Sequence, residues 1–250
     1  VVDYEVRDGV ALVTLNRPEK LNAINDDMQR GLLAALERIG SDGAVGAVVL
    51  SGRGRAFSTG ADIGGLEDKD EAGFAATIDR FMALATAFQS CPRPIVAAVH
   101  GYALAGGFEL ALVCDVRLAA AGTVFGLPDM PLGLSPTSGM TWLLPRIVGL
   151  GRAMHLTLSA ENIEAEEALA IGLVSKVVAP EDLAATAETY ARALAGHPRI
   201  GVERTKAGFL DSLTCDFGAA TRREAADELA CFRTPEVRQR FRAFINRKRG

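Results

Sequence analysis

Short apolar runs alternate with amphipathic stretches between Val10 and Val178. Each run predicts a strand, and the predicted strands are Val10–Leu15, Val45–Leu50, Ile95–Val99, Val116–Ala119, Val124–Phe125 and Leu173–Val178. Apolar residues at helical spacing predict helices from about Asp26, over Phe74–Gln89, over Gly107–Cys114 and over Thr137–Val148. This alternation of strand and helix favours an α/β core built from crossover units.

The pattern changes after Gly151, where amphipathic helices follow one another. They are expected near residues 151–158, 165–171 and 181–194, and three more run to the end of the chain. We therefore expect an α/β core over residues 1–190 and a helical C-terminal region over residues 191–250. Exposed apolar stripes in the second region, such as Phe232, Phe241 and Phe244, suggest contacts between subunits.

Composition narrows the classes of partner. The 250 residues are 49% hydrophobic and 23% charged with a formal net charge of -4, as in an ordinary globular protein that has no general attraction for nucleic acid or an anionic membrane. No stretch is long and apolar enough to span a membrane, and the first eight residues lack the basic start of a signal peptide. Four cysteines without CxxC spacing predict reduced thiols and a cytoplasmic protein.

Glu109 is the first candidate for chemistry. It is the only carboxylate between Pro94 and Val113, in an otherwise apolar stretch, and it follows the small-residue run Ala105-Gly106-Gly107. A buried ionised carboxylate is costly unless it is paired, hydrogen-bonded or used in a reaction. The alternative to a catalytic role is a buried salt bridge, with Arg117 as the nearest candidate partner.

Five segments, taken in order, resemble the crotonase family of enoyl-CoA hydratases and isomerases. They are Leu15–Ala23, Ala56–Ile63, His100–Glu109, Phe125–Gly133 and Ala168–Val174. Each would be weak evidence alone because small-residue runs are common, but their order and separations are specific. The resemblance covers nearly the whole chain and implies a spiral of ββα repeats with a helical C-terminal region.

The resemblance also implies a catalytic site for an acyl-CoA thioester. The backbone N–H groups of Ala61 and Gly106 would hold the thioester oxygen, where negative charge builds up during the reaction. Glu109 matches the first catalytic carboxylate of the family, and Asp129 stands where hydratases usually carry a second glutamate. In a hydratase the two carboxylates grip one water, which adds syn across the double bond without a metal and without a cofactor besides the coenzyme A of the substrate.

Further residues are assigned to coenzyme A by the resemblance. They are Lys20, Leu21, Ala23, Thr59, Gly60, Ala61, Asp62, Ile63 and Gly106, together with Phe232 and Arg247 reaching from a neighbouring subunit. Arg17, Arg53 and Arg55 are candidates for its phosphates. The family further implies a homotrimer or a hexamer and a place in fatty-acid β-oxidation.

Asp129 departs from the family pattern and leaves alternatives open. Its side chain is one methylene shorter than glutamate, which withdraws the carboxylate by about 1.5 Å. A shift of this size can cost on the order of a hundredfold in rate, and Asp129 could instead be a turn residue after Pro128. The first alternative is therefore an isomerase that moves a β,γ double bond to the α,β position, since one carboxylate suffices for it. A thioester hydrolase and a non-catalytic acyl-CoA binder are the others.

Overall fold

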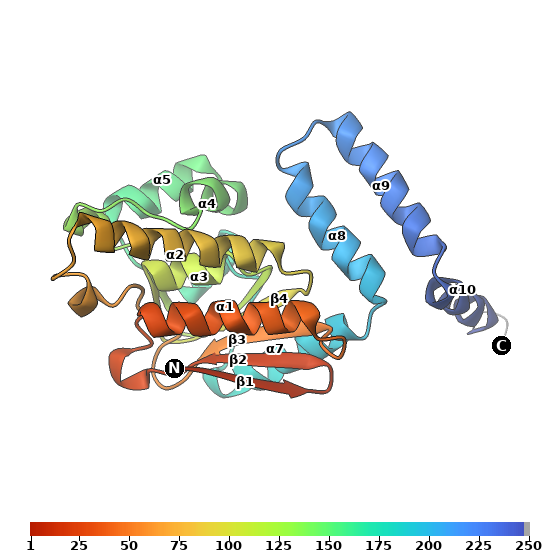
Figure 1. Ribbon diagram of the computed structural model, residues 1–250, viewed down its shortest axis with the longest axis horizontal. Helices are drawn as coiled ribbons and strands as arrows, with labels where there is room; N and C mark the ends of the chain where they lie inside the picture. The colour runs from red at the N-terminus through yellow and green to blue at the C-terminus, as the bar shows by residue number, and fades with distance from the viewer. Residues whose placement is uncertain (248–250) are drawn as a thin grey trace.

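The computed structural model describes residues 1–247, and the side chain of Arg247 lies outside the described part (Figure 1). The strands are β1 (Val2–Arg7), β2 (Val10–Leu15), β3 (Ala47–Gly52), β4 (Ile95–Val99), β5 (Tyr102–Leu104), β6 (Val116–Ala120), β7 (Val124–Gly126), β8 (Ile163–Glu164) and β9 (Lys176–Val178). The α-helices are α1 (Asp26–Ser41), α2 (Glu71–Ser90), α3 (Gly106–Leu112), α4 (Met140–Val148), α5 (Leu150–Ser159), α6 (Ala165–Ala170), α7 (Leu183–Ala195), α8 (Arg199–Ser212), α9 (Phe217–Phe232) and α10 (Pro235–Arg247). Short 3-10 helices are η1 (Pro18–Lys20), η2 (Ile63–Gly65), η3 (Met130–Leu132) and η4 (Pro180–Asp182).

The larger sheet has the strand order β1-β2-β3-β4-β6-β9, with β1 antiparallel to β2 and every other pair parallel. Parallel neighbours require a crossover connection, which here is supplied mainly by helices. The continuous apolar run Ile95–Val99 is buried at every position, as expected for a strand covered on both faces of its sheet. The carboxyl ends of β2, β3, β4 and β6 therefore meet at one edge of the sheet.

Two apolar clusters cover the two faces of this sheet. On one face α1 buries Met28, Leu32 and Ile39, whose spacing of three to four residues places them on one side of the helix. On the other face α7 packs Leu183, Ala187 and Ala191 against strands β2, β3, β4 and β6. The small alanines of α7 allow the helix to lie close to the sheet.

A second sheet of three short strands, in the order β5-β7-β8, completes the repeats. β4, β5 and α3 form one ββα unit, with one strand in each sheet, and β6, β7 and α4 form the next. The predicted ββα spiral is confirmed. The sequence did not reveal β5 and β8, because strands of three and two residues are too short to show an alternating pattern. It also did not reveal β1, an edge strand that is nowhere fully buried.

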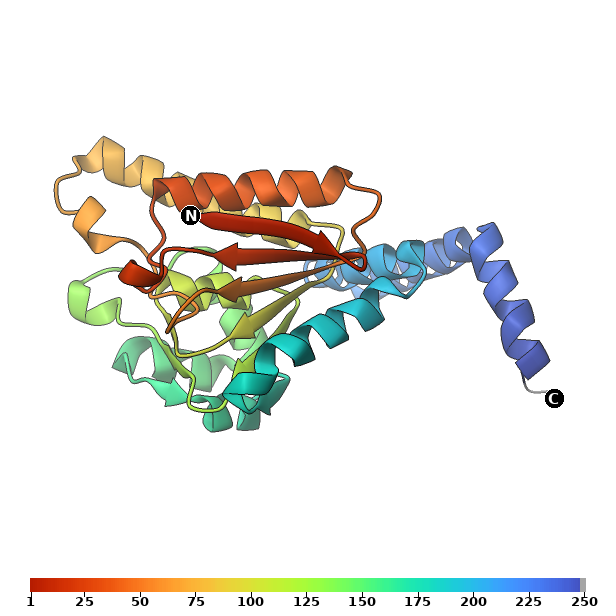
Figure 2. The ribbon, with the colours of Figure 1, turned by 90° about the horizontal axis from the view of Figure 1, so that it is seen from below.

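Helices α8, α9 and α10 project from the core as a helical extension (Figures 1 and 2). Residue 190, the expected end of the core, lies inside α7, and the extension begins with α8 at Arg199. None of the helices within residues 1–247 combines the length and the apolar character that crossing a bilayer requires.

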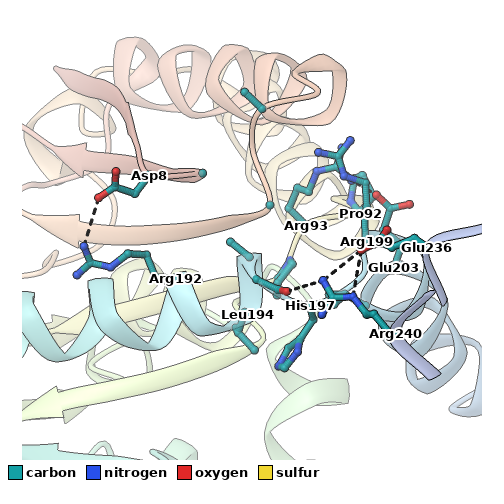
Figure 3. A pocket seen from close by; sticks show the side chains of 17 residues that line it. Asp8, Pro92, Arg93, Arg192, Leu194, His197, Arg199, Glu203, Glu236 and Arg240 are labelled. Carbon is teal, nitrogen blue, oxygen red and sulfur yellow. Dashed lines mark hydrogen bonds and ion pairs between the residues drawn. The ribbon is translucent and has the colours of Figure 1, made fainter. Parts of the chain in front are cut away.

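Ion pairs attach the base of the extension to the core around a pocket of about 470 Å³ (Figure 3). The pocket lies at the amino ends of β3 and β4, which is the opposite edge of the sheet from the segments expected to carry chemistry. Arg93, which is almost fully buried, pairs with Glu203 of α8, and Arg199 donates to the backbone oxygen of Val45 at 3.2 Å. Arg240 of α10 donates to the backbone oxygen of Gly196 at 3.1 Å. These contacts fix where α8 leaves the core.

Candidate active site

The segment after β3 and the segment after β4 are joined by backbone hydrogen bonds around Ser58. The Ser58 nitrogen donates to the Tyr102 oxygen at 3.0 Å, and the Leu104 nitrogen donates to the Ser58 oxygen at 3.0 Å. Ser58 therefore pairs with β5 as an additional strand residue would. This pairing places residues 59–62 beside the turn that leads from β5 into α3.

Glycine at position 60 allows these two segments to touch. A Cβ atom at Gly60 would lie 2.8 Å from the Gly106 nitrogen and 2.9 Å from the Leu104 oxygen, and the backbone there has φ +91°. A Cβ atom at Gly106 would lie 3.5 Å from the Ala61 nitrogen, so this nitrogen is within about 5 Å of the Gly106 α-carbon. Within residues 1–247 the N–H groups of Ala61 and Gly106 donate to no other group. Two free backbone donors thus lie side by side, which is the arrangement that an oxyanion requires.

The turn between β5 and α3 is strained. Ala105 has φ +46° and ψ −124°, an unfavourable conformation for a residue with a side chain, and its nitrogen donates to the Gly126 oxygen at 2.9 Å. The Ser58 oxygen lies so close to the following Gly107 that a Cβ atom at that position would be 2.2 Å from it. Strain of this kind persists only where the surrounding structure holds it, and here β7 and Ser58 do so.

The buried side chain of Asn22 holds the loop that carries the Ala61 N–H. The Asn22 amide group donates to the Arg53 and Ala56 oxygens at 2.9 and 2.8 Å, and its side-chain oxygen accepts from the Arg17 nitrogen at 2.8 Å. The Ser58 hydroxyl donates to the Asn22 backbone oxygen at 2.9 Å and accepts from the Gly60 nitrogen at 3.2 Å. Since Asn22 is fully buried, these bonds form in a low-dielectric environment and fix the loop firmly.

The residues assigned to coenzyme A in the first half of the chain come together. The Thr59 nitrogen donates to the Leu21 oxygen at 3.2 Å, which joins the segment Lys20–Ala23 to the segment Thr59–Ile63. Ile24, which directly follows the first segment, pairs with Ala61 of the second segment in a parallel bridge. Lys20 and Ile63 are exposed at the rim of this surface, as a large ligand would require.

Two of the arginines considered for the phosphates are already paired. Arg17 bonds both the Asp62 carboxylate at 3.0 Å and the Ala23 oxygen at 2.8 Å, so it clamps the two coenzyme A segments to each other. Arg53 pairs with Asp3 at 2.9 Å. Arg55 has no carboxylate partner in the described part of the chain and stays the candidate for a phosphate.

Glu109 is 3% exposed, and Thr137 holds both of its carboxylate oxygens. The Thr137 nitrogen donates to its Oε1 at 2.6 Å, and the Thr137 hydroxyl donates to its Oε2 at 2.9 Å. The alternative of a salt bridge with Arg117 is wrong, because the Arg117 guanidinium donates to the backbone oxygens of Leu173 and Cys114 at 2.7 Å each. Burial raises the pKa of Glu109, the hydrogen bonds from Thr137 and Ser138 oppose that rise, and the charge of Asp129 adds to it.

Asp129 lies after β7 and acts electrostatically on Glu109. Phe108 of α3 meets Phe125 of β7 edge-on with ring centroids 5.6 Å apart, and this contact fixes the two elements that carry the carboxylates. The Asp129 Oδ2 atom is buried and has no hydrogen-bond partner among the described residues. Its burial raises the pKa of the Asp129 carboxyl group, and only its own backbone N–H opposes this.

The two C-terminal candidates stand apart from this site in the single chain. Phe232 ends α9 in the extension, where its ring packs against Phe241 with centroids 6.2 Å apart. The role expected for Phe232, contact with coenzyme A bound to a neighbouring subunit, stays a prediction. The side chain of Arg247, for which the same role was expected, lies outside the described residues.

Three supporting residues were not singled out from the sequence. Asn22, Ser58 and Thr137 each hold a segment or side chain of the candidate site through side-chain hydrogen bonds. Asn22 and Ser58 lie within the segments Leu15–Ala23 and Ala56–Ile63 that carry the family resemblance, and this position could have pointed to them. Thr137 carried no signal, because it lies 28 residues from the carboxylate that it holds.

We expect Asp129→Asn to stabilise the protein while impairing its chemistry. The folded state raises the pKa of Asp129, so the ionised form costs stability that grows as the pH rises through that pKa, and asparagine has no such charge. The melting temperature should therefore rise at pH 8, where Asp129 is ionised, and the gain should shrink toward pH 4. Asp68→Asn, at an exposed position, is the control. A gain that is the same at both pH values would refute the burial argument.

Comparison with known proteins agrees with this geometry. The family model for enoyl-CoA hydratase/isomerase matches residues 5–249. The short-chain-enoyl-CoA hydratase of Clostridium acetobutylicum is 36% identical, with 99% of this chain and 95% of that protein covered. The crotonyl-CoA hydratase of Syntrophomonas wolfei is 34% identical over 98% of this chain and 95% of its own.

The fold is also similar to solved structures of this family. The crystal structure of an enoyl-CoA hydratase from Bacillus anthracis superposes with a TM-score of 0.94 at 29% identity, and the match covers 99% of this chain and 96% of that one. The match spans both the α/β core and the helical extension. The chain therefore belongs to the enoyl-CoA hydratase/isomerase family, the crotonase family, and it is an enzyme of that type.

Proposed function

We propose that this protein is a hydratase that adds water to a 2-enoyl-CoA thioester. The observation that carries the proposal is a pair of carboxylates, the buried Glu109 and the half-buried Asp129 with its buried Oδ2 atom, in one site with the two free backbone donors of Ala61 and Gly106. A carboxylate pair suits the handling of one water, and the adjacent donors suit the charge that forms on a thioester oxygen. The relatives named as hydratases add independent support.

The environments of the carboxylates suggest their roles. Glu109 receives two hydrogen bonds from Thr137, which favour its ionised form, so it acts as the base that takes a proton from water. The water oxygen bonds to the β-carbon, and the π electrons move toward the α-carbon and the thioester oxygen, where Ala61 and Gly106 donate. Asp129 has no donor to its Oδ2 atom and supplies a proton to the α-carbon. Proton exchange with solvent then restores both carboxyl groups, and the net change is the addition of one water.

Glu109→Gln tests this assignment. We expect kcat for hydration of crotonyl-CoA to fall by about 10²–10⁴-fold, because the base is lost, with little change in affinity for the thioester. The exposed change Glu67→Gln is the control for loss of a negative charge. Turnover that survives in Glu109→Gln at the wild-type rate would refute the role of Glu109.

Isotope labelling separates hydration from the alternatives. With wild-type protein in ¹⁸O-labelled water, a hydratase places the label in the 3-hydroxyacyl product. Exchange of the α-proton without uptake of label would identify an isomerase, which the short Asp129 side chain motivates. Release of free coenzyme A thiol would identify a thioester hydrolase, and binding without any of these changes would identify a non-catalytic binder.

We propose that the acyl group is short. A cavity of about 10 Å³ lies beside Gly106 between α2 and α3, room for about one water molecule. Its apolar walls include Phe81, Leu84 and Leu110, and the Phe81 Cε1 atom lies 3.4 Å from where a Cβ of Gly106 would be. A long acyl chain entering past the oxyanion donors would meet these side chains. The two relatives quoted above are named for short-chain and crotonyl substrates, which agrees with this.

Phe81→Leu tests the limit on chain length. We expect wild-type kcat/KM to be highest for the four-carbon thioester and to fall for eight-carbon and longer chains. A smaller side chain at position 81 should improve kcat/KM for the eight-carbon substrate by about tenfold relative to the four-carbon one, the effect of one or two methylene groups. Met82→Ala, on the exposed side of α2, should leave the ratio unchanged. An unchanged ratio in Phe81→Leu would show that the acyl chain leaves the site by another route.

We propose a homotrimer or a dimer of trimers, built through the helical extension. Phe209 and Phe217 are 72% and 84% exposed, and an apolar groove of about 960 Å³ lies between the extension and α4. Exposed aromatic side chains beside an apolar groove on an isolated chain indicate a protein interface. Light scattering should give three or six times the chain mass of 26.4 kDa, and Phe209→Glu should lower it. A monomer at micromolar concentration would contradict the proposal.

We further propose that the enzyme works in the cytoplasm, in a pathway such as fatty-acid β-oxidation. Cys91, Cys114, Cys215 and Cys231 are free thiols, which suits a reducing compartment. Enrichment of the protein in the membrane or exported fraction of cells would contradict the location.

A further inference from the structure

The Glu109 carboxylate is held mainly by Thr137, a residue from a distant part of the chain, with Ser138 beside it. Thr137 belongs to the segment between η3 and α4, and it donates through both its backbone N–H and its hydroxyl, one to each carboxylate oxygen. A carboxylate has about four acceptor positions on its two oxygens. Thr137 and the Ser138 side chain together leave acceptor capacity free, so the group is held in orientation without being fully occupied.

The backbone around Thr137 is built to aim these donors. Ser138 has φ +53° and the following Gly139 has φ +75°, so two consecutive residues adopt the left-handed conformation before α4 begins. The Met140 nitrogen closes the turn on the Thr137 oxygen at 2.8 Å. Ser138 is not glycine and is 6% exposed, so its strained conformation is one that the surrounding packing maintains.

The electrostatic environment of Glu109 disfavours its ionised form, and Thr137 opposes this effect. The only charged side chain in residues 1–247 found to act on Glu109 is Asp129, which has the same sign. Arg117, the candidate cation, is directed at backbone oxygens instead. Stabilisation of an ionised Glu109 therefore depends on hydrogen bonds, and those that are seen come from Thr137, with Ser138 contributing.

We propose that Thr137 is a positioning residue, whose hydroxyl, together with its N–H, fixes the orientation of the Glu109 carboxylate and keeps it ionised for its work as a base. The inference rests on the proposed function for its kinetic consequences. The part that concerns the hydroxyl is specific, since any residue except proline offers the backbone N–H, whereas the second bond needs serine or threonine at this position.

Thr137→Val and Thr137→Ser form the matched pair that tests it. Valine keeps the shape and the backbone N–H but removes the hydroxyl donor, and serine keeps the donor but removes the methyl group. For Thr137→Val we expect kcat on crotonyl-CoA to fall by about 10- to 100-fold with KM nearly unchanged, and the acidic limb of the pH profile of kcat/KM to move to higher pH. Thr137→Ser should restore both. Wild-type behaviour of Thr137→Val, or equal damage in Thr137→Ser, would overturn the proposal.

A readout without substrate separates this inference from the proposed function. The ¹³C signal of the Glu109 carboxyl group, identified by its absence in Glu109→Gln, can be titrated in the intact protein. We expect it to titrate at higher pH in Thr137→Val than in wild type, and at the wild-type pH in Thr137→Ser. If the titration is the same in Thr137→Val and wild type, the proposed effect of the Thr137 hydroxyl on the Glu109 carboxylate is refuted. If it shifts but no enoyl-CoA is hydrated by wild type, the proposed function fails and the hold by Thr137 stands.

Discussion

The contact between the Gly60 loop and the turn into α3 is the constraint on which the rest of the site depends. Two backbone nitrogens can share one oxygen only if no side chain separates them, and a Cβ atom at Gly60 or Gly107 would collide with the facing backbone. The contact is built from backbone bridges at Ser58 and from the buried amide of Asn22. The Gly60 loop follows the carboxyl end of β3, and the turn into α3 follows β4 by way of β5, so the adjacent parallel strands β3 and β4 bring the two segments to the same edge of the sheet.

The carboxylates show how a site can oppose stability. Glu109 and Asp129 are both desolvated, they carry the same charge, and burial raises the pKa of each. The two carboxylates differ in their hydrogen bonds, because Glu109 receives two from Thr137 while the Asp129 Oδ2 atom receives none. Two chemically similar groups thus receive different hydrogen bonds from their surroundings, which is the kind of difference that separates an acid from a base in a shared site.

The C-terminal helices divide according to what their apolar faces meet. α7 buries Leu183, Ala187 and Ala191 against the sheet and is part of the core. α8 is attached at its base by ion pairs such as the one between Arg93 and Glu203, while Phe209 farther along it stays exposed. A helix with an exposed aromatic surface leaves apolar area available for contacts beyond its own chain, whereas the two faces of the larger sheet are covered within the chain.

The sequence by itself determined the α/β class, most of the longer strands and helices, and the motifs around Ala61, Gly106, Glu109 and Asp129. Hydrophobic period and glycine placement are local properties, so they can be read along the chain. The short strands β5 and β8 carry too few residues to show a period, and only the second sheet that they form with β7 reveals them.

Only the tertiary structure decided which partner each buried polar group has. Arg117 is the nearest cation to Glu109 in sequence, yet the turn at Ser138 and Gly139 brings Thr137 to that carboxylate and leaves Arg117 to backbone oxygens. Arg17 looked available for a phosphate but pairs with Asp62, 45 residues away. Such pairings follow from where distant segments meet in space, and the free energy of a buried charge depends on that meeting rather than on its neighbours along the chain.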